Sequence, residues 1–123
     1  LCWNATFNPL SVILDHPISL VLQSGCLLEM VRQAIREIIA VAAASGIVLH
    51  PDIVEDTISA SHALGDYYTS MYEDYKNGKP TEIEHFNGDI IRRAEKFGIA
   101  APTHKALYFL VKGLELKRDM KKG

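Results

Sequence analysis

The sequence has 123 residues, a length that suits one domain and lets it bury about two-thirds of the surface that the unfolded chain exposes. Its 48% hydrophobic and 23% charged residues are ordinary for a soluble globular protein and exclude a disordered tail. The formal net charge is −2 and the longest apolar run covers only residues 38–44, so neither nucleic acid nor a membrane is an expected partner.

The two cysteines, Cys2 and Cys26, lie far apart without CxxC spacing, which suits a reducing, cytoplasmic compartment. No signal peptide is visible. The chain begins at Leu1 rather than at Met, and core-like residues follow at once without a polar cap. We therefore expect a fragment of a longer protein that begins inside a helix.

Helical periodicity dominates the sequence. Apolar residues three and four apart predict a long helix that ends at Gly46. Its buried stripe consists of Leu28, Val31, Ile35, Ile38 and Ala42. A capping box over Asp52–Glu55 predicts a second helix that runs to about Asp66. Residues 68–75 continue with helical spacing, and the polar stretch 76–80 predicts a turn.

A second capping box, Thr81–Glu84, predicts another helix, which ends at Gly98. Pro102 opens the last helix, and the basic segment 117–123 is expected to be a solvated helix end. No segment shows sustained alternation of the strand type. The sequence therefore predicts one compact all-α domain of about six helices over residues 1–123.

Familiar motifs for cofactor and metal binding are missing. No two glycines are separated by a single residue, so the sequence has neither a G-x-G-x-x-G turn nor a P-loop. The 5 histidines lack the i, i+4 spacing of a helical metal pair, and we expect no metal site. Asn4-Ala5-Thr6 matches a glycosylation sequon, which we discount because nothing else indicates secretion. Any nucleotide cofactor must be held mainly by residues outside this chain.

Asn4 and Asn8 are four residues apart, so both amides lie on one face of a helix. Asparagine is a mediocre helix former, because its side chain competes for backbone hydrogen bonds. Two interpretations stay open. Either Asn8 caps a break made by Pro9, or the pair forms a polar site whose apolar walls are Trp3 and Phe7.

Glu82 is expected at the first helical position after Thr81, where the helix dipole favours an anion. The simpler role is to stabilise the helix end. Because Glu84 completes the capping box, Glu82 is also free to point elsewhere. Ser70 and Asp74 share one face of the preceding helix, where an isolated serine is usually structural.

Five motifs follow one another along nearly the whole chain. They are Asn4-x-x-x-Asn8-Pro9-Leu10-Ser11, Ser70-Met71-Tyr72-Glu73-Asp74, Gly78-Lys79-Pro80-Thr81-Glu82-Ile83-Glu84, Asn87-Gly88 and Gly98-Ile99-Ala100-Ala101-Pro102-Thr103. In this order they resemble the second domain of the 2-dehydropantoate 2-reductases (ketopantoate reductases). The resemblance implies the all-α C-terminal domain of a two-domain reductase like 6-phosphogluconate dehydrogenase. The N-terminal Rossmann domain of such a reductase is absent from residues 1–123.

The resemblance also implies an activity for the full-length protein, that of an NADP-dependent oxidoreductase. Hydride passes from NADPH to the keto carbon of ketopantoate, or of a related branched 2-oxo acid, and gives the 2-hydroxy acid of pantothenate biosynthesis. Substrate lies between the two domains, and a lysine directly before Leu1 supplies the proton. Because the cofactor is bound mainly by the missing domain, we expect this chain alone to be inactive.

Carried over residue by residue, the resemblance implies that Asn4 is both catalytic and substrate-binding. Asn8 and Ser70 are implied to bind substrate, and Glu82 to be the active-site glutamate. The chemistry agrees, since amide and hydroxyl donors stabilise the oxygen that gains charge and a carboxylate keeps a nearby lysine charged. We expect these four side chains to line one cleft.

Two positions, Tyr67 and Ile18, depart from the polar residues that some family members carry, which leaves the exact substrate open. The surface that faces the missing domain is expected to be apolar, and we therefore expect the chain to pair with itself as a homodimer. A second hypothesis is a non-catalytic helical interaction or dimerisation module. A small-molecule-binding regulator ranks last.

Overall fold

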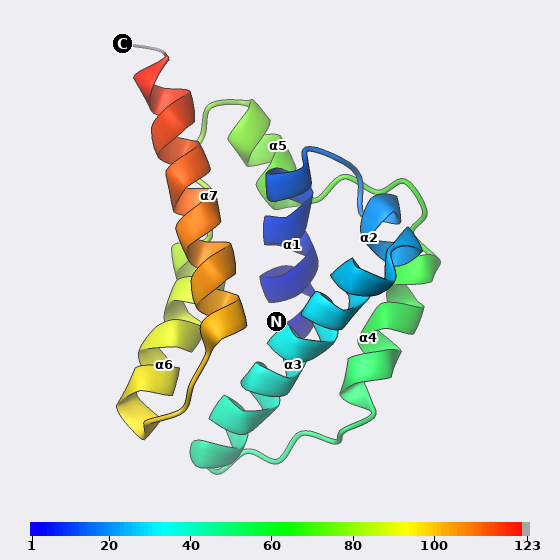
Figure 1. Ribbon diagram of the computed structural model, residues 1–123, viewed down its shortest axis with the longest axis vertical. Helices are drawn as coiled ribbons and strands as arrows, with labels where there is room; N and C mark the ends of the chain where they lie inside the picture. The colour runs from blue at the N-terminus through cyan, green and yellow to red at the C-terminus, as the bar shows by residue number, and fades with distance from the viewer. Residues whose placement is uncertain (122–123) are drawn as a thin grey trace.

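A computed structural model describes residues 1–121, which form helices and no strand (Figure 1). The elements are α1 (Cys2–Leu14), α2 (Ser19–Gln23), α3 (Gly25–Ala44), α4 (Ile53–His62), α5 (Ser70–Lys76), the π-helical turn η1 (Glu84–Gly88), α6 (Asp89–Phe97) and α7 (Pro102–Met120). The predicted all-α domain is confirmed, and the short helix α2 is the one α-helix that was not predicted. The end of the expected basic tail, residues 122–123, lies outside the described residues. Among residues 1–121, no helix combines the length and apolar character needed to cross a membrane.

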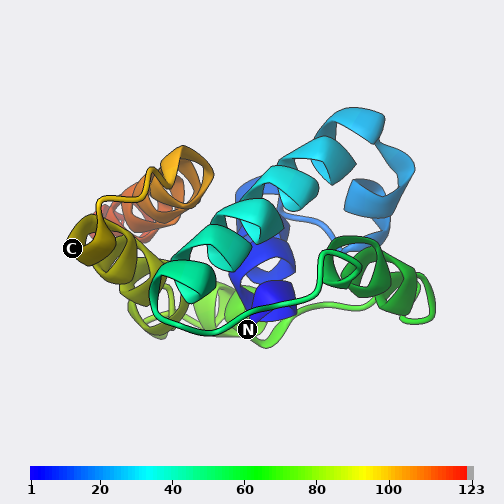
Figure 2. The ribbon, with the colours of Figure 1, turned by 90° about the horizontal axis from the view of Figure 1, so that it is seen from below.

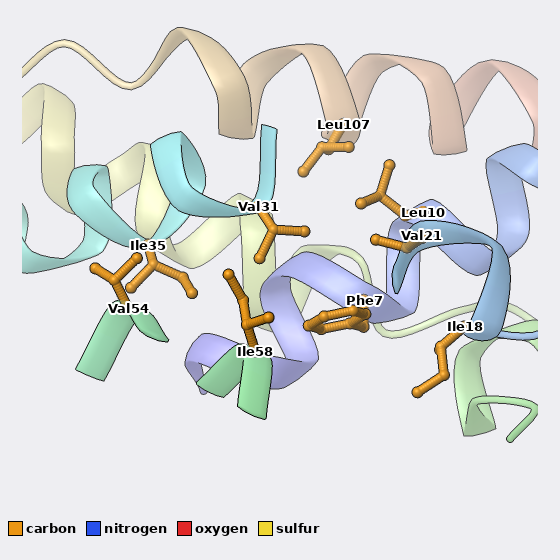
Figure 3. Packing of buried hydrophobic residues seen from close by; sticks show 9 residues of the cluster. All are labelled: Phe7, Leu10, Ile18, Val21, Val31, Ile35, Val54, Ile58 and Leu107. Atoms are coloured by element: carbon orange, nitrogen blue, oxygen red, sulfur yellow. The ribbon is translucent and has the colours of Figure 1, made fainter. Parts of the chain in front are cut away.

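Helix α1 lies at the centre of the domain, where it packs against α3, α5, α7 and η1 (Figure 1). Eight consecutive residues of α1, from 5 to 12, are buried, so the helix is enclosed on several sides. Figure 3 shows the main core cluster around it, formed by Phe7, Leu10, Ile18, Val21, Val31, Ile35, Val54, Ile58 and Leu107. Each buried aliphatic or aromatic side chain contributes about 1.5–3 kcal/mol relative to its exposed form.

Glycines end two helices at the predicted places. Gly46 follows α3 with φ +89°, and Gly98 follows α6 with φ +69°, a left-handed backbone that glycine adopts without strain. The predicted capping box at Asp52 is wrong, because the Asp52 side chain makes no capping hydrogen bond. Glu55 instead accepts from Arg32 of α3 at 2.9 Å. Helix α4 also stops at His62, short of the expected end.

Helix α7 begins on a carboxylate from another helix. Glu37 of α3 accepts from the backbone N–H groups of Thr103 and His104 at 3.0 and 3.1 Å. An anion at the N-terminus of a helix pairs free N–H groups and complements the helix dipole. This contact fixes α7 against α3. Figure 2 shows α7 and α4 on opposite sides of the molecule, with α1 between them.

Candidate active site

The two predicted asparagine amides lie one turn apart on α1. The helix continues through Pro9 to Leu14, so Asn8 does not cap a break. Asn4 is half-buried, and Asn8 is only 2% exposed. The Oδ1 atom of Asn8 is buried and accepts no hydrogen bond within residues 1–121. Such an unpaired atom costs about 1–3 kcal/mol, a cost that a hydrogen-bond donor on a ligand would remove.

A chain of hydroxyl groups ties the start of α5 to α1. The Oγ atom of Ser11 donates to the Asn8 carbonyl at 2.7 Å and lies 2.7 Å from Oγ1 of Thr69. The same Thr69 oxygen accepts from the N–H of Tyr72 at 3.0 Å and caps α5. Ser70, the first residue of α5, is exposed, and its hydroxyl has no partner within residues 1–121. These contacts place Ser70 next to the helix that carries Asn8.

The segment that carries Glu82 reaches α1 through the next residue. Ile83 is 1% exposed and packs with Val12 of α1 and Met71 of α5. Because Glu82 precedes Ile83 and Ser70 precedes Met71, these contacts bring both segments to the same part of α1. The Glu82 side chain is exposed, and its carboxylate has no partner among residues 1–121.

The capping box predicted for Thr81 and Glu84 is wrong. Oγ1 of Thr81 is buried and unpaired, and the Thr81 N–H donates to Glu115 of α7 at 2.9 Å. The helix begins only at Glu84, as the π-helical turn η1. Glu82 therefore lies before the helix rather than in its first turn, and its carbonyl accepts the N–H groups of residues 85 and 86.

Glu84 is held by three side chains. Its carboxylate accepts from the Tyr108 hydroxyl and from Arg92 at 3.2 Å, and it lies 3.4 Å from Nζ of Lys112. The Tyr108 hydrogen bond, together with Arg92 and Lys112, lowers the pKa of Glu84 below its ordinary value. These contacts occupy Glu84 and leave Glu82 as the unpaired carboxylate of this segment.

The four predicted residues belong to segments that meet at α1, but no hydrogen bond joins any two of their side chains within the described chain. Several surface hollows lie elsewhere, along α7 and the turn before residue 81. Across residues 1–121, no group of three or more His, Cys, Asp or Glu side chains is placed to hold a metal ion. One cleft lined by all four side chains remains a prediction.

Sequence reasoning gave no role to Asn87 and His104, which form a buried polar network. Nδ2 of Asn87 donates to the Ala5 carbonyl at 2.8 Å and lies 3.0 Å from Nδ1 of His104. Nε2 of His104 lies 2.7 Å from the Ala34 carbonyl, which only accepts, so the proton belongs on Nε2 and Nδ1 accepts from Asn87. Burial lowers the pKa of His104 and favours this neutral ring.

The fold places the chain among helical domains of two-domain oxidoreductases. It resembles the 2-dehydropantoate 2-reductase of Methylococcus capsulatus with a TM-score of 0.87 and 38% sequence identity, over 94% of this chain and 40% of that one. It resembles D-mandelate dehydrogenase, solved with NADH and anilino(oxo)acetate, with a TM-score of 0.88 and 34% identity, over 94% of this chain and 49% of that one. The fold is that of a reductase C-terminal domain.

The family follows from the sequence comparison. The model of the family "Ketopantoate reductase PanE/ApbA C terminal" matches residues 1–115, and the chain belongs to this family. The 2-dehydropantoate 2-reductase of Pyrobaculum aerophilum is 28% identical over 115 residues, which are 94% of this chain and 41% of that protein. The enzyme of Streptococcus pyogenes serotype M6 is 32% identical over 116 residues, which cover 93% of this chain and 38% of that protein. The chain thus spans about two-fifths of its relatives' length.

Proposed function

We propose that this chain is the substrate-binding half of an NADPH-dependent 2-dehydropantoate 2-reductase. The reaction reduces ketopantoate, or a related branched 2-oxo acid, to the 2-hydroxy acid in pantothenate biosynthesis, in the cytoplasm. The observation that supports this best is the buried and unpaired amide oxygen of Asn8, one turn from Asn4, at the part of α1 where the segments bearing Ser70 and Glu82 meet. The family to which the chain belongs supports the same assignment.

The nicotinamide cofactor is proposed to bind to a domain that precedes this one. The described residues fit that division, because the chain has no glycine-rich turn for a pyrophosphate and supplies unpaired polar groups suited to a small polar molecule. When bound, the cofactor supplies the hydride that the keto carbon of the substrate gains. The chain's own residues then have to hold the substrate and manage the charge on its oxygen.

Each of the four residues has a proposed task. The amide Nδ2 of Asn4 donates to the keto oxygen, where negative charge develops as the carbon gains hydride. Asn8 and Ser70 bind the polar groups of the substrate without adding charge. The Glu82 carboxylate, which has no partner within residues 1–121, keeps the proton-donating lysine of the preceding segment charged and oriented. The lysine gives its proton to the oxygen and completes the alcohol.

An aryl-substituted 2-oxo acid is a second candidate substrate. Aromatic side chains gather at the start of α1, where the Trp3 ring stacks on Phe7 at 5.4 Å and meets the edge of Tyr67 at 5.9 Å. Tyr67 is 43% exposed and contacts Trp3, the residue directly before Asn4. This group of aromatic side chains therefore reaches the surface near Asn4. The likeness to a dehydrogenase of mandelate, an aryl 2-hydroxy acid, supports this alternative.

Steady-state kinetics of the full-length protein test the proposal. Ketopantoate, branched aliphatic 2-oxo acids and aryl 2-oxo acids would each be assayed with NADPH and with NADH. We expect the largest kcat/KM for ketopantoate with NADPH. A larger value for phenylglyoxylate would favour the aryl substrate, and no turnover of any 2-oxo acid would contradict the proposed reaction class.

A further inference from the structure

We propose that Asn87 is a positioning residue for the candidate active site, an inference that rests on the function proposed above. Its side chain lies in the buried network and is 0% exposed, so it acts through other residues rather than on the substrate. Through its amide it holds the segment that bears Glu82 against α1, directly beside Asn4.

Pro9 leaves one carbonyl of α1 without its helical partner. In an α-helix each carbonyl accepts from the N–H four residues later, and proline has no N–H. Pro9 lies inside α1, so the Ala5 carbonyl lacks this donor. Ala5 is 0% exposed, and bulk water does not take the donor's place. A buried carbonyl of this kind requires a partner from another element.

The Asn87 amide is that partner, and its orientation is determined. One Nδ2 proton is given to the Ala5 carbonyl at 2.8 Å, and the other points to Nδ1 of His104 at 3.0 Å. A flipped amide would set Oδ1 against the Ala5 carbonyl, two acceptors with no proton between them. The Oδ1 atom of Asn87 is left unpaired in the described chain, so the amide is kept for its two donors.

The contact joins two predicted parts of the site by a short path. Ala5 directly follows Asn4, and Asn87 belongs to the turn η1, which starts two residues after Glu82. Hydrogen bonding in this turn reaches back to the Ile83 carbonyl at 2.9 Å. One hydrogen bond and a few ordered residues thus link Glu82 to Asn4, in addition to the packing of Ile83 on Val12. Misplacement of a reacting group by about 1 Å can lower a rate by about a hundredfold.

The first test compares turnover in the full-length enzyme. Asn87→Ala is expected to lower kcat at least about tenfold, with KM for ketopantoate changed less than about twofold. Glu82→Gln lowers kcat by itself, and adding Asn87→Ala to it should lower kcat less than about twofold further, because Asn87 acts through Glu82. If the loss of kcat in the double variant equals the product of the losses in the two single variants, the inference is wrong.

The second test separates positioning from stability. Pro9→Ala restores an N–H to the helix, so the Ala5 carbonyl stays paired when Asn87 is removed. The Pro9→Ala, Asn87→Ala variant should therefore recover much of the melting temperature that Asn87→Ala loses, yet remain as slow as Asn87→Ala. If Asn87→Ala alone does not fold, this double variant still measures the effect of losing Asn87 on kcat. Recovery of wild-type kcat in it would show that Asn87 is only structural.

The control is a buried residue away from the turn. Val54→Ala opens a cavity in α4, where Val54 is 7% exposed, and should lower the melting temperature without changing kcat. If Asn87→Ala, like Val54→Ala, lowers the melting temperature but leaves kcat unchanged, while Glu82→Gln lowers kcat, only the inference about Asn87 fails. If Glu82→Gln turns over like wild type, the proposed role of Glu82 fails, and the positioning role fails with it.

Discussion

The side-chain amide of Asn8 is nearly enclosed by protein, and its oxygen has no partner within residues 1–121. A leucine of similar size would remove this unpaired group and add apolar contacts. We expect Asn8→Leu to raise the free energy of unfolding of the chain by about 1 kcal/mol while it abolishes substrate binding in the full-length protein. Urea unfolding measures the first effect. Gln33→Leu, at an exposed site, should change stability little, and a destabilised Asn8→Leu chain would contradict the argument.

Asn4 and Glu82 carry the proposed chemistry, and neither is needed for the packing of the core. In the full-length protein we expect Asn4→Ala and Glu82→Gln each to lower kcat by about a hundredfold or more, since one lost donor to a developing negative charge costs about 2.7–4 kcal/mol. Circular dichroism should show an unchanged fold. Wild-type kinetics in both variants would assign these residues to structure only.

His104 is expected to make the stability of the domain depend on pH. Burial lowers its pKa in the folded chain, so the unfolded chain binds the proton more readily. The stabilisation is therefore complete above the unfolded pKa of about 6.5 and is lost as pH falls below it, by at most about 1.4 kcal/mol per pH unit. Urea midpoints at pH 7.5 and 5.5 measure this loss. His104→Gln should flatten the dependence, and an unchanged slope in that variant would assign it to other groups.

At the scale of the elements, Glu37 replaces the local cap that α7 lacks. The N-cap residue of α7 makes no side-chain hydrogen bond to the first turn of the helix. Glu37 of α3 accepts hydrogen bonds from the N–H groups of Thr103 and His104 instead. We expect Glu37→Ala to lower the free energy of unfolding by about 1–2 kcal/mol, as the loss of a helix cap does. Glu29→Ala, an exposed carboxylate on the same helix, should cost less than about 1 kcal/mol. Equal losses in the two variants would show that the cap contributes nothing.

The long helices could be predicted because their apolar stripes are local patterns. Three features could not be predicted in this way. The box Thr81–Glu84 has the spacing of a cap, but Glu84 is bound by Tyr108, Arg92 and Lys112, which all lie outside the box. Helix α2 has five residues, too few to show a period, and the π turn η1 has no sequence signature of its own.

The candidate site could be predicted in part, for the same reason. The four-residue spacing of Asn4 and Asn8 is local, and their place on one helix follows from it. Asn87 could not be given a role, because its partner is a backbone carbonyl 82 residues away. The one signal was Pro9, because a proline inside a helix leaves the carbonyl four residues earlier without its helical donor.

At the scale of the whole molecule, the proposed function assigns both the cofactor site and the proton donor to residues outside this chain. We expect residues 1–123 alone to oxidise no NADPH in the presence of ketopantoate. Absorbance at the wavelength of reduced nicotinamide measures this, with the full-length protein as the positive control. Turnover by the chain alone would contradict the assignment of the cofactor to a preceding domain.

The outer face of α7 is expected to mediate self-association. Residues 102, 106, 109, 113, 116 and 120 are exposed and alternate in steps of four and three, the spacing of a helix–helix seam. Phe109, Leu116 and Met120 are 64%, 64% and 72% exposed. Sedimentation should show a dimer that Leu116→Glu dissociates, whereas Ile47→Glu, at an exposed apolar site outside α7, should not. A monomeric wild-type chain would contradict this expectation.

The turn η1 is, in effect, an α-helix with one residue inserted, since the N–H of Gly88 donates to the carbonyl of Ile83, five residues earlier. A deletion of one residue between them would restore an ordinary α-helix. It would also rotate everything before the turn by about 100° and draw it in by about 1.5 Å. Ile83 would then leave its place in the core, and Glu82 would move with it. Among relatives, insertions and deletions should therefore accumulate in the loop at residues 77–80 and avoid the five residues that follow Ile83.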